Sequence, residues 1–161
     1  MPIFVATMST NKLEKENPQL LLLKEKVGKT MKEGLSPYGH WIDGKLLEAN
    51  FGQVKFAIEV RSDMTNPLQM LHGGASAGII DEVIGVAVFS LGRPNFFSTI
   101  NLVVDYFASA KLGDVVIAEA KVVKPGNSIV NVTCDIWNEA GTKHIAKASS
   151  NLMKIDQTFG I

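Results

Sequence analysis

The chain has 161 residues, of which 46% are hydrophobic and 20% charged, so it can bury one good core and is most simply one domain. Lysine plus arginine and aspartate plus glutamate number 16 each, so there is no overall basic field, and we expect neither a nucleic acid nor a membrane as partner. The single Cys134 excludes an internal disulfide and CxxC metal sites; with no visible signal peptide or membrane-length apolar run, the sequence favours a cytoplasmic location.

The N-terminal segment, residues 1–40, is predicted to carry one amphipathic helix. Asn17 is typical of a helix cap and Pro18 of the first helical position, and apolar residues follow at helical spacing until Gly34 ends the pattern. The prolines and glycines of residues 37–44 then predict a loop.

Two strands and a long helix are predicted next. Alternation predicts strands over 45–50 and 53–60, joined near Gly52. The apolar segment from about 73 to 91, closed by Gly92, is too long for a typical strand and predicts a helix. Because this helix is apolar nearly all round, it must be enclosed by other elements.

The second half of the chain has the period of two that is typical of strands. It predicts strands over 96–106, 115–124, 128–138 and 144–155, with Ile100, Leu102, Val104 and Tyr106 on one face of the first. Because short turns join these strands, we expect them to be neighbours in chain order, as an antiparallel meander. The predicted fold class is α+β: a curved antiparallel β-sheet wrapped around a long central α-helix, with an extra N-terminal helix and the main domain over 41–157.

Two adjacent carboxylates, Asp81 and Glu82, interrupt the apolar helix. Burying an ionised carboxylate is costly unless it is paired, so we expect the chain to use at least one of them. Gly73 and Gly74 open the same helix, where the first N–H groups lack internal partners and suit a developing oxyanion. The alternative is that His72-Gly73-Gly74 is only a tight loop into a helix.

Asp81 shares its helix face with small residues, whereas Glu82 has larger neighbours and is expected to be structural, with an ion pair as one option. A large group could lie against the small face, or the face could pack on another helix while Asp81 makes a buried hydrogen bond; its small members are Gly74, Ala77, Gly78 and Gly85. Gly73 and Asp81 lie about 12 Å apart along one helix axis, too far to share one carbonyl. A second copy of the helix, crossing antiparallel, would bring them together, so we expect a homodimer with shared sites.

The ordered set of Asn66, Leu71-His72-Gly73-Gly74, Asp81, the strand over 99–106 and Ala110-Lys111-Leu112-Gly113-Asp114 resembles the hotdog-fold acyl-CoA thioesterases of the PaaI-like (phenylacetate-pathway) superfamily. The resemblance covers roughly residues 41–156. It implies the helix-in-sheet fold, homodimers that can pair as a dimer of dimers, and hydrolysis of an acyl-CoA thioester to free CoA and a carboxylic acid. It implies no cofactor, since CoA is part of the substrate.

The resemblance also implies residue roles. Asp81 matches the nucleophile or general base, and Gly73 matches the backbone donor to the thioester oxygen. Asn66 matches a side-chain amide that helps to bind that oxygen or the water, His72 the residue that positions this loop, and Thr99 a hydroxyl near the water.

The CoA moiety would need phosphate-binding groups at the mouth of the site. The candidates are Lys124, Gly126, Asn127 and Ser128. Arg93 and Lys143 are further candidates, although each of the three cations also fits an ordinary solvated surface charge. No metal is expected, because His72 and the carboxylates are too far apart on one helix.

Other functions stay open at this point. The chain could be a non-catalytic acyl-CoA or fatty-acid-binding hotdog module, although the retention of Asn66, Gly73 and Asp81 favours chemistry. A hotdog dehydratase or hydratase would call for a histidine and an acid that move protons on the acyl chain, and the histidines do not recur at such positions. The choice between aryl and medium-chain acyl groups is also open.

Overall fold

The computed structural model describes residues 17–34 and 36–159, so the residues before 17 in the predicted N-terminal segment lie outside it. The helices are α2 (Pro18–Glu25), α3 (Pro37–Ile42) and α4 (Gly73–Phe89), with short 3-10 turns η1 (Met31–Glu33) and η2 (Ser62–Met64). The strands are β1 (Lys45–Asn50), β2 (Gln53–Glu59), β3 (Asn95–Tyr106), β4 (Val115–Pro125), β5 (Ile129–Asn138) and β6 (His144–Thr158).

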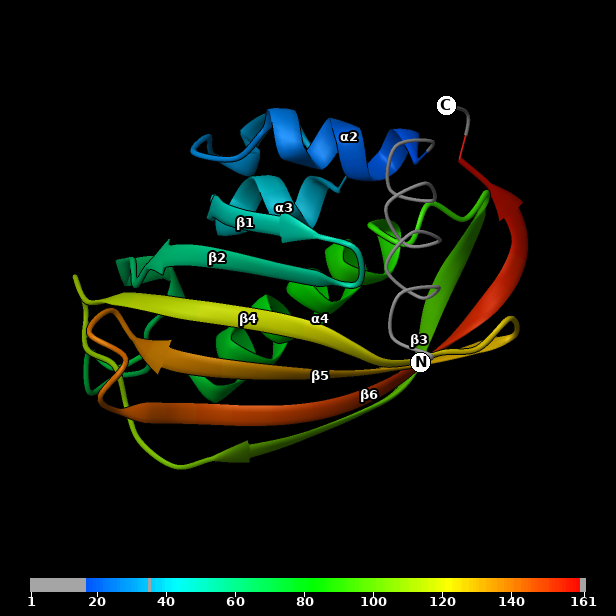
Figure 1. Cartoon of the computed structure of the whole chain (residues 1–161). Helices are drawn as coiled ribbons and strands as arrows, with labels where there is room; N and C mark the ends of the chain where they lie inside the picture. Colours follow the sequence, from blue (N-terminus) through cyan, green and yellow to red (C-terminus); the bar gives the residue numbers. More distant parts are fainter. Residues whose placement is uncertain (1–16, 35, 160–161) are drawn as a thin grey trace, which may run out of the picture.

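The long helix α4 lies against a curved antiparallel sheet, as Figure 1 shows. Its buried side chains include Ile79, Ile80 and Ile84, which belong to the same apolar core as the inward-facing residues of the strands. Burying each such side chain contributes roughly 1.5–3 kcal/mol to folding. The predicted α+β architecture is confirmed, because a helix this apolar is stable only when a sheet encloses it.

The sheet has six strands in the order β1-β2-β4-β5-β6-β3, and every neighbouring pair is antiparallel. Strands β4, β5 and β6 form the predicted meander, but the prediction that β3 neighbours β4 was wrong, since β3 pairs with β6. The connection after Tyr106 is held across the end of the sheet by the bonds Leu71 N–H to Ala110 O (2.8 Å) and Gly113 N–H to Val60 O (2.9 Å). Among the described residues, β3 is therefore an edge strand whose outer side has no pairing partner.

A β-bulge at Ile100 divides β3 into two halves of opposite phase. Thr99 pairs with Leu152 and Asn101 with Asn151, so Ile100 is the extra residue, and its side chain is 50% exposed. Leu102 and Val104 face the core, as predicted, but Ile100 does not share their face, which corrects the prediction. Before the bulge the odd-numbered residues face α4, and after it the even-numbered ones do.

The N-terminal helix α2 is shorter than predicted. The side chain of Asn17 caps it by accepting from Leu20 N–H at 2.9 Å, and the helix ends at Glu25 rather than near Gly34. The Asn17 amide also donates to Ser90 O at 2.9 Å, which ties the start of α2 to the end of α4.

A second helix, α3, occupies part of the predicted loop over 37–44. Ser36 caps it by accepting from Gly39 N–H at 3.1 Å, and Pro37 takes its first position. The loop prediction was wrong here because such a short helix depends on the tertiary contacts described below rather than on an intrinsic pattern.

Cys134 lies on β5 and is fully buried beside the core residues Val132 and Ile136. Its burial raises the pKa of the thiol, so Cys134 acts as a small hydrophobic residue rather than a nucleophile. In the described part of the chain, no helix is both long and apolar enough to cross a membrane.

Candidate active site

The loop before α4 is organised around His72. Its backbone N–H donates to Met64 O at 2.9 Å, and its Nδ1 accepts from Gly74 N–H at 2.9 Å, so His72 caps the helix. This bond requires Nδ1 to be unprotonated. Gly73 is the first residue of α4 and has no carbonyl one turn back within the helix, so its N–H can donate to a ligand.

Asn66 closes the same loop. Its Oδ1 accepts from Leu68 N–H at 2.9 Å and from Met70 N–H at 3.2 Å, while its backbone N–H donates to Met70 O at 2.8 Å. The amide oxygen is thus engaged by the loop itself. The Nδ2 amino group is the part of this side chain that can donate to a substrate oxygen or a water.

Asp81 lies in the middle of α4, with its side chain exposed. Thr99 Oγ1 donates to Asp81 Oδ1 at 2.8 Å, across 18 positions of sequence. Thr99 can reach the helix because it precedes the bulge of β3, where the odd-numbered residues face α4. The structure thus brings together two of the five site residues that the sequence proposed, an acceptor carboxylate and the hydroxyl that orients it.

Glu82 points in a different direction from Asp81. Ser36 Oγ donates to Glu82 Oε2 at 2.9 Å, and the Glu82 carboxyl lies against Gly39, where a Cβ would be 2.5 Å from Oε1. Burial raises the pKa of Glu82; the Ser36 hydrogen bond opposes that shift, and the nearby charge of Asp81 adds to it. Glu82 is hydrogen-bonded to α3 rather than ion-paired, which agrees with a structural role.

Tyr106 contacts the start of α4, a contact that sequence reasoning did not assign. Its Oη donates to Gly73 O at 2.9 Å, and its ring lies 3.6 Å from the position of a Cβ on Gly73. Tyr106 follows the bulge in β3, so it faces α4 although it is an odd number of residues from Thr99. Only the bulge, which the sequence pattern does not mark, allows both contacts.

The exposed side of α4 presents Gly74, Asp81 and Gly85 to the exterior of the chain, with Ala77 and Gly78 partly exposed. Gly73 and Asp81 are eight positions apart on one straight helix, which separates them by about 12 Å along its axis. Within one chain, the described residues therefore form two half-sites, one at the loop of Asn66, His72 and Gly73 and one at Asp81 and Thr99.

Comparisons with known proteins fit this geometry. The model of the thioesterase superfamily matches residues 68–145, which contain the start of α4, Asp81 and Thr99. This part of the chain is similar to the thioesterase superfamily. Acyl-coenzyme A thioesterase 13 from Homo sapiens is 29% identical over 102 residues, which is 63% of this chain and 73% of that protein.

Solved structures show the same fold as this chain. The E. coli PaaI protein from the phenylacetic acid degradation operon superposes with a TM-score of 0.75 at 18% identity, covering 88% of this chain and 97% of that one. A hypothetical thioesterase protein with coenzyme A from Streptococcus pneumoniae gives a TM-score of 0.67 at 24% identity, covering 72% and 88%. At these identities, both establish the fold of the part of this chain that they cover.

The residues proposed for CoA lie at the β4–β5 hairpin. The Arg93 guanidinium donates to Gly126 O and to Pro125 O, and it lies 5.5 Å from the centre of the Phe97 ring. Arg93 therefore has a structural role at the hairpin, and burial lowers its pKa. The side chains of Lys124, Asn127 and Ser128 are exposed, and Lys143 donates to Ser109 O at 2.6 Å on the β5–β6 side.

No hydrogen bond among residues 17–34 and 36–159 joins this hairpin to Asp81 or Asn66. The same ranges hold no cluster of three or more His, Cys, Asp or Glu side chains that could bind a metal ion.

Proposed function

We propose that this protein hydrolyses acyl-CoA thioesters to free CoA and a carboxylic acid. The observation that carries the proposal is the 2.8 Å contact between Thr99 and Asp81 on the exposed side of a helix that begins with a free N–H at Gly73. The match of residues 68–145 to the thioesterase superfamily model supports it, as does the human acyl-CoA thioesterase that resembles the chain. CoA is then part of the substrate, and the chemistry calls for no cofactor.

The oxyanion contact comes from the loop half-site. The Gly73 N–H, at the positive end of the α4 dipole, donates to the thioester oxygen, and Asn66 Nδ2 adds a second donor to that oxygen or to the water. His72 keeps the loop in place through its bond to Gly74 N–H. A thioester needs little further activation, because the thiolate leaves readily.

The carboxylate contact comes from the second half-site. Asp81, oriented by Thr99, either attacks the carbonyl carbon or takes a proton from the attacking water. On either route a C–O bond replaces the C–S bond, water supplies the oxygen, and a proton ends on the departing thiol. The direct test is Asp81→Asn, for which we expect a loss of at least about 100-fold in thiol release with the assembly intact.

Glu82→Gln is the matched control, since it makes the same chemical change at the next residue, and it should retain most of the activity. Near-normal turnover by Asp81→Asn would overturn the assignment. Binding of acyl-CoA by the unmodified protein without any thiol release would favour a non-catalytic binding module instead.

The active unit is a homodimer in which each site takes Gly73 from one protomer and Asp81 from its partner. Two observations support this arrangement: the two groups are about 12 Å apart on one helix, and the side of α4 that carries Asp81 is exposed together with the unpaired edge of β3. Light scattering would distinguish this dimer from a dimer of dimers.

Subunit mixing tests the shared site. Asp81→Asn and Gly73→Pro protomers are each inactive alone, and an equal mixture should recover about a quarter of the normal activity, because half the dimers are mixed and each has one intact site. Proline is compatible with the first helical position, so Gly73→Pro removes the N–H donor without breaking α4. Absence of recovery after verified subunit exchange would refute the shared site.

A further inference from the structure

The short helix α3 contacts α4 on both sides of the proposed catalytic carboxylate. Ser36 Oγ, at the cap of α3, donates to Glu82 Oε2 at 2.9 Å. One turn earlier on α4, the Tyr38 hydroxyl lies so close to Gly78 that a Cβ there would be 2.0 Å from Oη. Gly78 therefore has to be glycine for Tyr38 to occupy this position.

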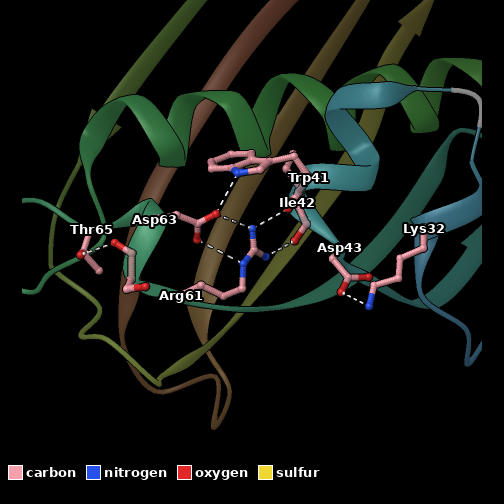
Figure 2. A network of polar contacts seen from close by, with 8 residues as sticks. Lys32, Trp41, Ile42, Asp43, Arg61, Asp63 and Thr65 are labelled. Atoms are coloured by element: carbon pink, nitrogen blue, oxygen red, sulfur yellow. Dashed lines mark hydrogen bonds and ion pairs between the residues drawn. The ribbon is translucent and has the colours of Figure 1, made fainter.

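A polar network connects the other end of α3 to the turn that leads into the Asn66 loop (Figure 2). The Arg61 guanidinium donates to the carbonyl oxygens of Trp41 and Ile42, and its Nε lies 3.2 Å from Asp63 Oδ1. Trp41 Nε1 donates to Asp63 Oδ2 at 2.8 Å. The hydrogen bond from Arg61 lowers the pKa of Asp63, so the carboxylate stays charged, and the network persists, over the neutral range.

Trp41 transmits this anchoring to Tyr38. The Arg61 guanidinium lies 5.5 Å from the centre of the Trp41 ring, and the Tyr38 and Trp41 rings are 5.4 Å apart with an interplanar angle of 33°. Tyr38 is nevertheless 45% exposed. The structure thus holds an aromatic ring firmly against α4 while leaving nearly half of it uncovered.

The position of that ring relates it to the substrate. Gly78 and Asp81 are three residues apart on α4, so they lie on the same side of the helix about 5–6 Å apart. When the carbonyl carbon of the acyl group lies at Asp81, the carbons next to it lie close enough to contact the Tyr38 ring. We propose that Tyr38 is a specificity-determining residue that forms one wall of the acyl site, selects acyl groups that are unbranched or planar next to the carbonyl, and excludes groups branched there.

This inference rests on the proposed thioesterase function and adds the class of acyl group. An unbranched chain or a flat ring can lie along the Tyr38 ring, whereas a branch next to the carbonyl points either into the ring or into the backbone of α4 at Gly78. Because Trp41, Arg61 and Asp63 hold the ring in place, it cannot move aside to admit the branch.

Butanoyl-CoA and 2-methylpropanoyl-CoA test the proposal, since they are isomers that differ only in branching. We expect Tyr38→Ala to raise the ratio of kcat/KM for the branched over the straight substrate by about tenfold, and Tyr38→Phe to leave it unchanged because the ring remains. The ratio does not depend on the fraction of folded enzyme, so a loss of stability alone does not change it. Tyr38→Leu is a smaller reduction in side-chain size and should shift the ratio in the same direction.

Met153→Ala is the control, because Met153 is similarly exposed (44%) and lies on β6, paired with Ile129. A ratio that is unchanged in Tyr38→Ala would overturn the proposal. The same ratio can be measured as affinities of the two acyl-CoAs for the Asp81→Asn protein, with and without Tyr38→Ala. If the unmodified protein hydrolyses neither these substrates nor any aryl or medium-chain acyl-CoA, the proposed function fails, while the affinity ratio still decides the role of Tyr38.

Discussion

Thr99→Val removes one hydroxyl group from the candidate site and changes little else. Valine has nearly the shape of threonine and is equally suited to a strand, so β3 should keep its pairing with β6. The hydroxyl donates to Asp81 Oδ1 at 2.8 Å and makes the one hydrogen bond to the Asp81 side chain that the structure gives within 17–34 and 36–159. The variant therefore tests whether that hydrogen bond orients the carboxylate for catalysis.

The expected magnitude follows from the exposure of the pair. A hydrogen bond to a charged group contributes about 1.5–3 kcal/mol, and water can replace part of it because both side chains are exposed in the single chain. We take the lower end, about 1.5 kcal/mol, which corresponds to a roughly tenfold decrease in kcat. KM should change little, since the hydroxyl acts on Asp81 rather than on the bound substrate.

The assay is thiol release from acyl-CoA at saturating substrate. Thr99→Ser keeps the hydroxyl and should restore most of the rate, whereas Thr133→Val makes the same change on β5 and should leave the rate unaltered. A Thr99→Val protein with normal kcat, beside an inactive Asp81→Asn protein, would refute the view that Thr99 orients the carboxylate.

Two further substitutions test the packing around α4. Ser90→Ala should lower the free energy of unfolding in urea by about 1–3 kcal/mol, because the buried Ser90 Oγ accepts from Gly52 N–H at 2.8 Å and the variant leaves that donor unpaired; an unchanged midpoint would contradict this. Glu82→Gln should stabilise the protein at neutral pH, and this gain in stability should disappear below about pH 4. Folding raises the pKa of Glu82, so the folded state loses stability as the pH rises and Glu82 becomes charged, whereas glutamine stays neutral at every pH. A stability difference between the Gln variant and the original that does not depend on pH would show that Glu82 is not desolvated.

Elements that depend on local patterns could be predicted from the sequence. Helix α4 follows from an apolar run too long for a strand, and β1 and β2 follow from alternation around Gly52. Helix α3 escaped prediction because its proline and glycine are typical of a loop. The available signal was Ser36 before Pro37, a cap followed by a residue that favours the first helical position.

The place of β3 in the sheet and the pairing inside the site depend on long-range contacts. Nothing in the spacing indicates that β3 crosses over to β6, because the eight residues after Tyr106 can serve a turn or a crossover. The sequence correctly placed Gly73 at the start of the long helix, directly after His72. It proposed Thr99 only through resemblance. It did not connect Tyr38 to α4 or Glu82 to the cap of α3, since those contacts span dozens of positions.

Because of the bulge at Ile100, the contact of Thr99 with Asp81 depends on the number of residues in β3. Deleting one residue there would leave Leu102, Val104 and Tyr106 in place but would turn Thr99 away from Asp81, because adjacent strand residues point to opposite faces. Most strands tolerate any side chain that keeps the alternation of buried and exposed residues. Strand β3 also needs a fixed number of residues between Thr99, which contacts Asp81, and Tyr106, which contacts Gly73. Insertions and deletions between Thr99 and Tyr106 should therefore be as strongly selected against as substitutions at Asp81. This holds even though Ile100 takes part in neither of the two contacts, that of Thr99 with Asp81 and that of Tyr106 with Gly73.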